Sequence, residues 1–276
     1  MDKNDYLRQY YGSYREDARL SAAKHGLVEY LTTMKYIHKF LEQGMRILEV
    51  GAGTGRYSLA LAKEGFRVDA VELLEHNLNI LRSKTEDGMR LQAVQGDALD
   101  LSRYQENTFD ITLLLGPMYH LYTQDERKKA LEEAVRVTRE KGILYIAYCM
   151  NDPTVVGELF ARGTIYDCLE KGKLTEDFHF TAQPEDLFAL VRTEDIAELN
   201  QSVQAERICL TATDGATGYM RPVIDNMNDE QFGIYMKYHL AVCERQDLIG
   251  ASHHTLDILR KKTPTSGTKR EQKTKT

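Results

Sequence analysis

The sequence lacks any apolar run that approaches the roughly 20 residues needed to cross a bilayer as a helix. Its opening stretch, MDKNDYLRQYYG, also lacks the apolar centre of a secretory signal peptide. These two absences exclude the membrane-spanning and secreted classes from our expectation. We therefore predict a cytoplasmic protein with no membrane attachment.

Paired cysteines and excess positive charge are missing as well. The four cysteines form no C-x-x-C pair, so we expect neither a disulfide framework nor a cysteine metal site. The formal net charge of −6 argues against a dedicated nucleic-acid binder. Residues 261–276 have the opposite balance, with six Lys or Arg and a single acid. We interpret residues 263–276 as a solvated, disordered basic tail, with attraction of RNA as the alternative.

Two nucleotide-binding fingerprints are absent although a glycine-rich turn is present. Residues 47–58 read ILEVGAGTGRYS, a short apolar run that contains one acid, Glu49, and leads into a helix-compatible segment. Three glycines occupy alternate positions: Gly51, Gly53 and Gly55. The dinucleotide fingerprint would place its third glycine at Arg56, and the Gly-Lys-Ser/Thr of a P-loop does not occur. A turn of this kind still lets a ligand approach bare backbone and the free N–H groups of a helix N-terminus.

Later segments continue the pattern of a nucleoside-binding α/β unit. Residues 68–71, VDAV, end at Glu72, which lies 17 residues beyond Gly55. A Rossmann-type unit places a carboxylate near this point, where its two oxygens can accept from both ribose hydroxyls. Residues 91–96, LQAVQG, lead into Asp97, and residues 109–115, FDITLLL, lead into the loop GPMYH.

Taken in order, these segments resemble the class I S-adenosylmethionine-dependent methyltransferases over residues 40–150. The resemblance implies S-adenosylmethionine as cofactor and S-adenosylhomocysteine as product. It implies that Asp97 accepts from the adenine amino group, that the N–H of Ala98 bonds the ring, and that Glu49 orders the glycine loop and the methionine amino group. The cofactor-binding residues predicted on this basis are Glu49, Gly51, Ala52, Gly53, Gly55, Glu72, Leu73, Asp97, Ala98, Leu115 and Tyr11.

Alternating strand and helix signals predict an α/β fold with a parallel sheet wound on both faces. The resemblance implies a Rossmann-like, seven-stranded sheet whose last strand is antiparallel. We expect an amphipathic helix over 19–41, a helix capped by Thr123 and Glu126, a helix over 194–203, and a helix over 229–245 capped by Asn228. The expected strands are 46–50, 67–72, 90–95, 109–115, 142–149, 206–213 and 254–261.

The same pattern predicts how the chain is organised. We expect a single methyltransferase domain over 1–262, with an N-terminal helical cap over 1–43 and a core over 44–150. Two insertions, about 151–190 and 215–252, interrupt the regular alternation. They are expected to form a lid over the carboxyl edge of the sheet, where open α/β folds bind their ligands.

Methyl transfer from a sulfonium is an in-line displacement, and a general base helps when the acceptor is an alcohol, a phenol or a protonated amine. His120 lies where the donor methyl should emerge and is our candidate base; the alternative is a histidine that caps the next helix or hydrogen-bonds backbone. An aromatic face of Tyr11 or Tyr14 over the sulfonium would gain cation–π attraction. Candidate substrate-pocket residues, chosen by position, are Tyr14, Tyr119, His120, Phe178, Phe180 and Arg192. We interpret His239, His253 and His254 as structural.

Motifs of several methyltransferase subclasses are absent. The chain reads LGPMY where nucleic-acid amino-methyltransferases have D/N/S-P-P-Y/F, and it contains no Pro-Cys nucleophile and no paired glutamates in this loop. Gly116 and Pro117 stand where metal-dependent O-methyltransferases have an acid, so no metal is expected. A small-molecule methyltransferase is therefore the leading hypothesis. The alternatives are a methyltransferase acting on RNA or protein, and a cofactor-binding protein or NAD oxidoreductase without this activity. The oligomeric state is not indicated.

Overall fold

The computed structural model describes residues 2–13, 20 and 23–263. The strands of this part form one eight-stranded sheet in the order β3-β2-β1-β4-β5-β8-β7, with β6 paired to β5 beside this path. Among them, β8 alone runs in the direction opposite to the other strands. The predicted α/β class with an antiparallel last strand is thus confirmed. The strands are β1 (Arg46–Val50), β2 (Arg67–Glu72), β3 (Leu91–Gln95), β4 (Phe109–Leu114), β5 (Thr138–Met150), β6 (Leu190–Val191), β7 (Ala205–Ala212) and β8 (His254–Lys261).

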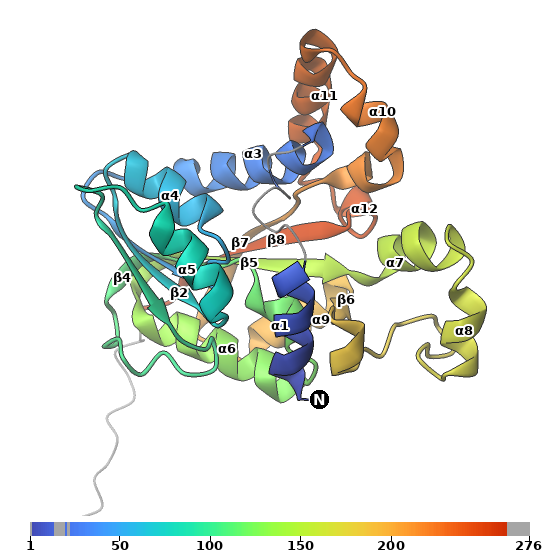
Figure 1. Ribbon diagram of the computed structural model, residues 1–276, viewed down its shortest axis with the longest axis horizontal. Coiled ribbons are helices and arrows are strands. Elements are labelled where there is room, and N and C mark those ends of the chain that lie inside the picture. The colour runs from blue at the N-terminus through green and yellow to red at the C-terminus, as the bar shows by residue number, and fades with distance from the viewer. Residues whose placement is uncertain (1, 14–19, 21–22, 264–276) are drawn as a thin grey trace, which may run out of the picture.

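Helices cover both faces of the sheet (Figure 1). On one face Ile37 and Leu61 pack with strand residues such as Ile47, and all three are fully buried. On the other face the core includes Ala134 and Leu199. Burying each large aliphatic side chain contributes about 1.5–3 kcal/mol, so these two layers fix the sheet in place. The helices of the first face are α3 (Lys24–Lys39), α4 (Arg56–Lys63) and α5 (Glu75–Ser83); those of the second are α6 (Gln124–Val137) and α9 (Thr193–Gln201).

The pairing register brings the ends of four parallel strands to one edge. Val50 pairs with Val71 on one side and Leu114 on the other, and Glu72 pairs with Gln95. The residues that follow these strands therefore meet at the same edge of the sheet. That edge is where ligands bind in doubly wound folds.

Capping signals in the sequence placed two helices correctly. The N–H of Glu126 donates to the Thr123 hydroxyl at 3.1 Å, and the Thr123 N–H donates back to the Glu126 carboxylate at 3.2 Å. Asn228 and Gln231 form the same reciprocal pair at the start of α11 (Asp229–Val242). These pairs satisfy backbone donors that the helix itself cannot satisfy, which is why they mark its beginning.

Three elements differ from the sequence-based expectation. The N-terminal region contains α1 (Lys3–Ser13) before α3, whereas we expected one helix over 19–41. β5 begins at Thr138 and not at 142, because the chain passes directly from α6 into the strand. β6 was not predicted, since two residues are too few to show a period.

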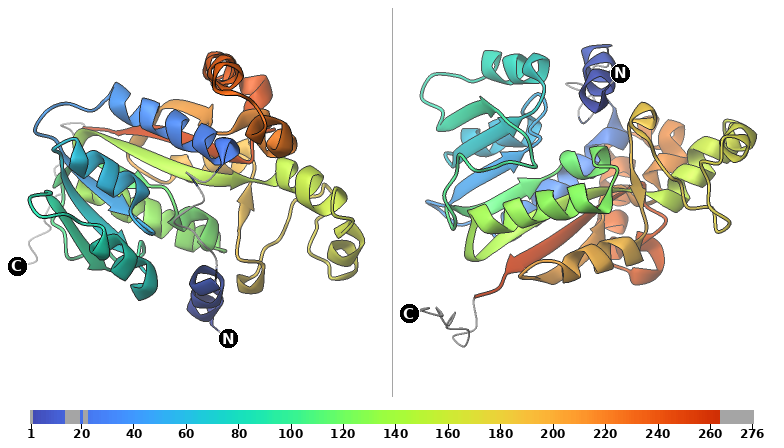
Figure 2. Two further views of the ribbon diagram at one scale, coloured as in Figure 1. Left: turned by 45° about the horizontal axis from the view of Figure 1, so that its top comes forward. Right: turned by 90° about the horizontal axis from the view of Figure 1, so that it is seen from below.

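Both predicted insertions lie at the end of the sheet toward which β5 points (Figures 1 and 2). No helix among residues 2–13 and 23–263 has the length and apolarity to cross a membrane. The first insertion holds α7 (Asn151–Thr154), a π-helical turn (Val155–Phe160), α8 (Ile165–Glu170) and a 3₁₀ turn (Pro184–Asp186). The second holds a 3₁₀ turn (Gly215–Met220), α10 (Arg221–Asp225), α11 and α12 (Gln246–Ile249).

Candidate functional site

The glycine-rich turn after β1 needs its glycines for two reasons. Gly51, Gly53 and Gly55 have φ values of 74°, 54° and 89°, which disfavour any residue with a Cβ. Neighbours also crowd two of them: a Cβ on Gly51 would lie 2.6 Å from the Pro117 ring, and one on Gly55 would lie 2.1 Å from Leu81. The turn therefore presents backbone, and not side chains, to the edge of the sheet.

Two acids support this turn from different sides. Glu49 is buried beneath it, where it accepts a hydrogen bond from the Ser58 hydroxyl, and burial raises the pKa of Glu49 to about 8. Glu72 ends β2 and accepts from the N–H of Gly53 at 2.7 Å and from the N–H of Leu74 at 2.9 Å. Each Glu72 oxygen receives one of these bonds, and a carboxylate oxygen can accept a second.

Asp97 follows β3 at the same edge. Its carboxylate accepts from the N–H of Leu99 at 2.9 Å, which makes an Asx turn. Asp97 and Ala98 also line the cleft beside the glycine turn. The Asx turn therefore leaves Asp97 at the surface of the cleft, where a ligand can reach it.

These residues surround a cleft of about 110 Å³, which we call the glycine cleft. Of the predicted site residues, those that line it are Tyr11, Gly51, Gly53, Glu72, Leu73, Asp97, Ala98, Tyr119 and His120. Glu49, Ala52, Gly55 and Leu115, which were also predicted, do not line it. Sequence reasoning missed the lining residues Lys3, Leu7, Leu74, Asn77, Gly96, Gly116, Pro117 and Leu121.

Helix α1 forms one wall of the glycine cleft. Lys3, Leu7 and Tyr11 recur every four residues and so share one helix face, a spacing that was visible in the sequence. Lys3 pairs with Glu126 of α6 at 2.9 Å, and Leu7 is buried. The Tyr11 hydroxyl lies 2.8 Å from Nε2 of His120. Three separate contacts thus hold α1 over the cleft.

His120 uses both of its ring nitrogens. Nδ1 lies 2.8 Å from the Leu187 carbonyl, which can only accept, so Nδ1 carries the proton. Nε2 then accepts from the Tyr11 hydroxyl. Burial lowers the pKa of His120 to about 4, and the ring is neutral near pH 7. The same Leu187 carbonyl also accepts from the Tyr122 hydroxyl at 2.9 Å.

A group of rings separates the glycine cleft from a second cavity. Tyr10, Tyr11, Tyr119, His120 and Phe188 contact one another with centroids 4.9–5.9 Å apart. Tyr11 and Tyr119 line both spaces. We call the second space, of about 440 Å³, the histidine cavity. Its ionisable lining residues are His25, Glu29, Glu158, Arg162, Asp214, Arg221, His253 and His254.

A buried ion pair lies in the wall of the histidine cavity. Asp214 accepts from Nδ1 of His254 at 2.8 Å and from the Ser252 hydroxyl at 2.5 Å. Although burial opposes its ionisation, these contacts lower the pKa of Asp214 to about 2. Burial also disfavours a charged His254, but Glu29 and Asp214 raise the pKa of His254 well above its usual value. Both partners are therefore ionised.

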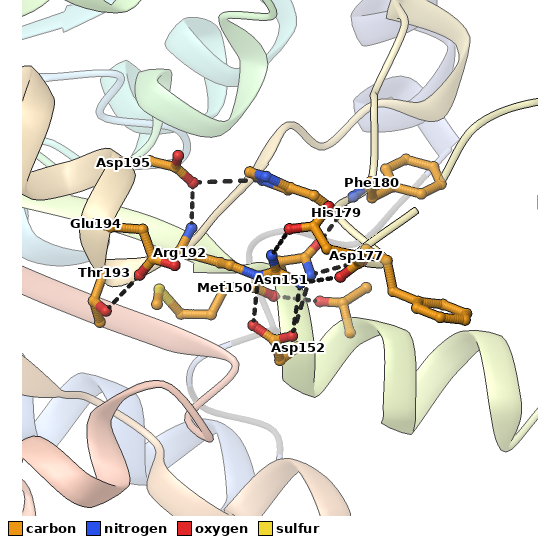
Figure 3. A network of polar contacts seen from close by, with 12 residues as sticks. Met150, Asn151, Asp152, Asp177, His179, Phe180, Arg192, Thr193, Glu194 and Asp195 are labelled. Carbon is orange, nitrogen blue, oxygen red and sulfur yellow. Dashed lines mark hydrogen bonds and ion pairs between the residues drawn. The ribbon is translucent and has the colours of Figure 1, made fainter. Parts of the chain in front are cut away.

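Three residues chosen by position lie elsewhere: Phe178, Phe180 and Arg192. Arg192 donates to Asp152 at 3.1 Å and to Asp177 at 2.6 Å, while Asn151 bonds the backbone of Phe178 and Phe180 (Figure 3). This network fastens the loop to the end of β5. The structure thus brings neither Phe178, Phe180 nor Arg192 to the glycine cleft or the histidine cavity. The remaining candidate, Tyr14, falls outside the described residues.

A family model described as a methyltransferase domain matches residues 47–142. That stretch runs from β1 through the glycine turn to the start of β5, and it holds the parallel strands β1 to β4 in the arrangement described above. The chain carries a class I S-adenosylmethionine-dependent methyltransferase domain. S-adenosylmethionine is the cofactor of such a domain.

Relatives of the methyltransferase domain act in different reactions. A glycine/sarcosine N-methyltransferase from Aphanothece halophytica is 28% identical over 147 residues, which cover 52% of this chain and 55% of the relative. A demethylmenaquinone methyltransferase from Clavibacter sepedonicus is 32% identical over 165 residues, 59% of each protein. This chain therefore spans little more than half the length of these curated relatives.

Solved structures share the fold over most of the chain. A methyltransferase from Methanosarcina mazei superposes with a TM-score of 0.56 at 15% identity, covering 82% of this chain and 97% of that one. A protein from Pyrococcus horikoshii gives 0.58 at 14% identity, with 92% and 99% covered. At such identities the likeness concerns the fold alone.

Proposed function

We propose that this protein transfers the methyl group of S-adenosylmethionine to a small molecule held in the histidine cavity. The supporting observation is the wall that the two spaces share, where Tyr11 and Tyr119 line both. A displacement between two bound ligands requires adjoining sites with a fixed mutual orientation. The ring group provides such a junction.

The residues of the glycine cleft fit the cofactor. The turn at Gly51 and Gly53 presents bare backbone to the cleft, and Glu72 offers oxygens suited to the two ribose hydroxyls. Asp97 and the N–H of Ala98 are assigned to the adenine, with Leu73 beside it. When bound, S-adenosylmethionine supplies an electrophilic methyl group on a sulfonium.

We infer that His120 positions Tyr11 and does not remove a proton from the acceptor. Its one lone pair already accepts from the Tyr11 hydroxyl, and a ring whose pKa is about 4 is a weak base at neutral pH. Tyr11 is in turn held with its ring at the junction of the two spaces. There it excludes water and offers an aromatic face to a sulfonium.

The size and lining of the histidine cavity support a small acceptor. Its volume of about 440 Å³ falls in the usual range for small-molecule sites, which is about 300–1,000 Å³. Glu158 comes from the first insertion and Arg221 from the second, so we infer that both insertions close over the acceptor. The relatives named for glycine, sarcosine and demethylmenaquinone agree with an acceptor of this kind.

The test is to incubate the protein with methyl-labelled S-adenosylmethionine and an extract of its source cell that lacks the gene. Label in the low-mass fraction would support the proposal. Label in RNA or protein would refute it. Tight S-adenosylhomocysteine binding without any transfer would instead favour a protein that binds the cofactor only.

A further inference from the structure

We propose that the acceptor carries a carboxylate, and that His253 and Arg221 bind this group in the histidine cavity. The inference rests on the proposed function, because it specifies the acceptor of that reaction. The sequence had suggested a structural role for His253. Its surroundings point to a binding role.

His253 is closely packed at the point where the two insertions meet. Its side chain is 7% exposed, and it precedes β8 on the wall of the cavity. A Cβ on Gly218 would lie 2.1 Å from Nδ1, and a Cβ on Gly157 would lie 2.9 Å from Nε2. Each insertion thus contributes one glycine that makes room for the imidazole. The ring is fixed before any ligand arrives, which lowers the entropic cost of binding.

The buried environment determines which nitrogen carries the proton. Nδ1 is fully buried, and neither ring nitrogen has a hydrogen-bond partner within the part of the chain that the structure describes. A buried N–H without a partner is rarer and costlier than a buried lone pair, so the proton belongs on Nε2, which is not fully buried. Burial also lowers the pKa of His253, so the ring is neutral. It therefore offers the cavity an N–H donor.

Arg221 provides the charge beside this donor. It begins α10 and lines the same cavity, and its positive charge helps to lower the pKa of His253. Its side chain makes no hydrogen bond within residues 2–13 and 23–263, and its Nη2 is 4.0 Å from the Glu158 carboxylate. A guanidinium with free donors, next to an N–H donor, suits an anionic oxygen group.

The other charges in the cavity favour a single negative charge on the ligand. Asp214 is paired with His254, and Glu158 is paired with Arg162 at 2.6 Å. Glu29 lies 3.7 Å from His254. The cavity thus holds three carboxylates that would repel a dianion such as phosphate. A carboxylate, with one negative charge and two oxygens, matches one guanidinium and one N–H.

The experiment uses the labelled products of the extract reaction. A product with a carboxylate should couple to an amine in the presence of a water-soluble carbodiimide, whether or not it also carries a cationic group. A product that does not couple, or that loses negative charge on phosphatase treatment, would overturn the inference while leaving the proposed function intact. If no label enters small molecules, the proposed function fails and the inference fails with it.

Variants link the product to the two residues. Arg221→Gln should lower transfer by about tenfold to a hundredfold at low extract concentration, because it removes charge-assisted hydrogen bonds. S-adenosylhomocysteine affinity should not change. Arg245→Gln is the matched control, since Arg245 is an exposed arginine of the same insertion, paired with Asp247. Unchanged transfer by Arg221→Gln would contradict the proposal.

A second pair of variants distinguishes loss of the N–H donor from loss of packing. His253→Gln keeps an N–H donor near the position of Nε2, whereas His253→Leu has none. Both should bind S-adenosylhomocysteine as the unaltered protein does, but the glutamine variant should retain several times more transfer. Equal loss in the two variants would show that packing, and not the donor, explains the effect.

Discussion

Replacing Tyr11 with phenylalanine should loosen α1 from the glycine cleft. The change deletes the hydroxyl that donates to His120 and leaves Nε2 without a partner in a buried ring. An unsatisfied buried acceptor costs about 1–3 kcal/mol, which is about 5-fold to 150-fold in an equilibrium constant. The part-exposed Lys3–Glu126 pair contributes about 1 kcal/mol at most and cannot compensate.

Calorimetry with S-adenosylhomocysteine and amide hydrogen exchange of α1 would measure this effect. The affinity for S-adenosylhomocysteine should fall by about 5-fold to 150-fold. The backbone amides of α1 should exchange faster both with and without this ligand. Tyr166→Phe is the control, because Tyr166 is 74% exposed on α8. If Tyr11→Phe changed neither the affinity nor the exchange rate, this hydroxyl would not hold α1 over the cleft. The positioning role inferred for His120 would then be wrong.

Three further predictions concern the acids and glycines of the site. Glu72→Gln should weaken S-adenosylhomocysteine binding by at least about tenfold in calorimetry, since it loses a charged acceptor. The pKa of Glu49 is raised to about 8 in the folded state, so the protein should lose on the order of a few kcal/mol of stability as pH rises from about 4.5 to 8. Melting temperatures of Glu49→Gln should lack this loss; a parallel pH profile would refute the assignment. Gly218→Ala, but not Gly250→Ala, whose Cβ meets nothing within 4 Å, should reduce transfer and spare cofactor binding.

Local signals explain what the sequence could predict. The glycine turn, the two capping boxes and the central strands depend on residues within a few positions of one another. The location of Glu72 and Asp97 could be predicted because parallel strands end at one edge of the sheet. A residue at or just after the end of each strand must therefore lie at that edge. For these features, reading along the chain was sufficient.

Contacts between distant segments explain what it could not predict. Tyr11 meets His120 across 109 positions, and no local pattern encodes that pairing. Arg192 was chosen as a pocket residue by its position, but Asp152 and Asp177 engage it once the first insertion folds back on β5. His253 depends on two insertions that meet only in the folded protein.

The position of the Leu187 carbonyl limits which residues can be changed to alter the acceptor specificity. It receives hydrogen bonds from His120 and Tyr122 at once, and the neighbouring Phe188 contributes to the ring group. A substitution that shifts this loop would disturb the cofactor side and the acceptor side together. Libraries aimed at new acceptors should therefore leave 187–190 untouched and vary the walls from the two insertions, where acceptor recognition can change while the methyl donor stays in place.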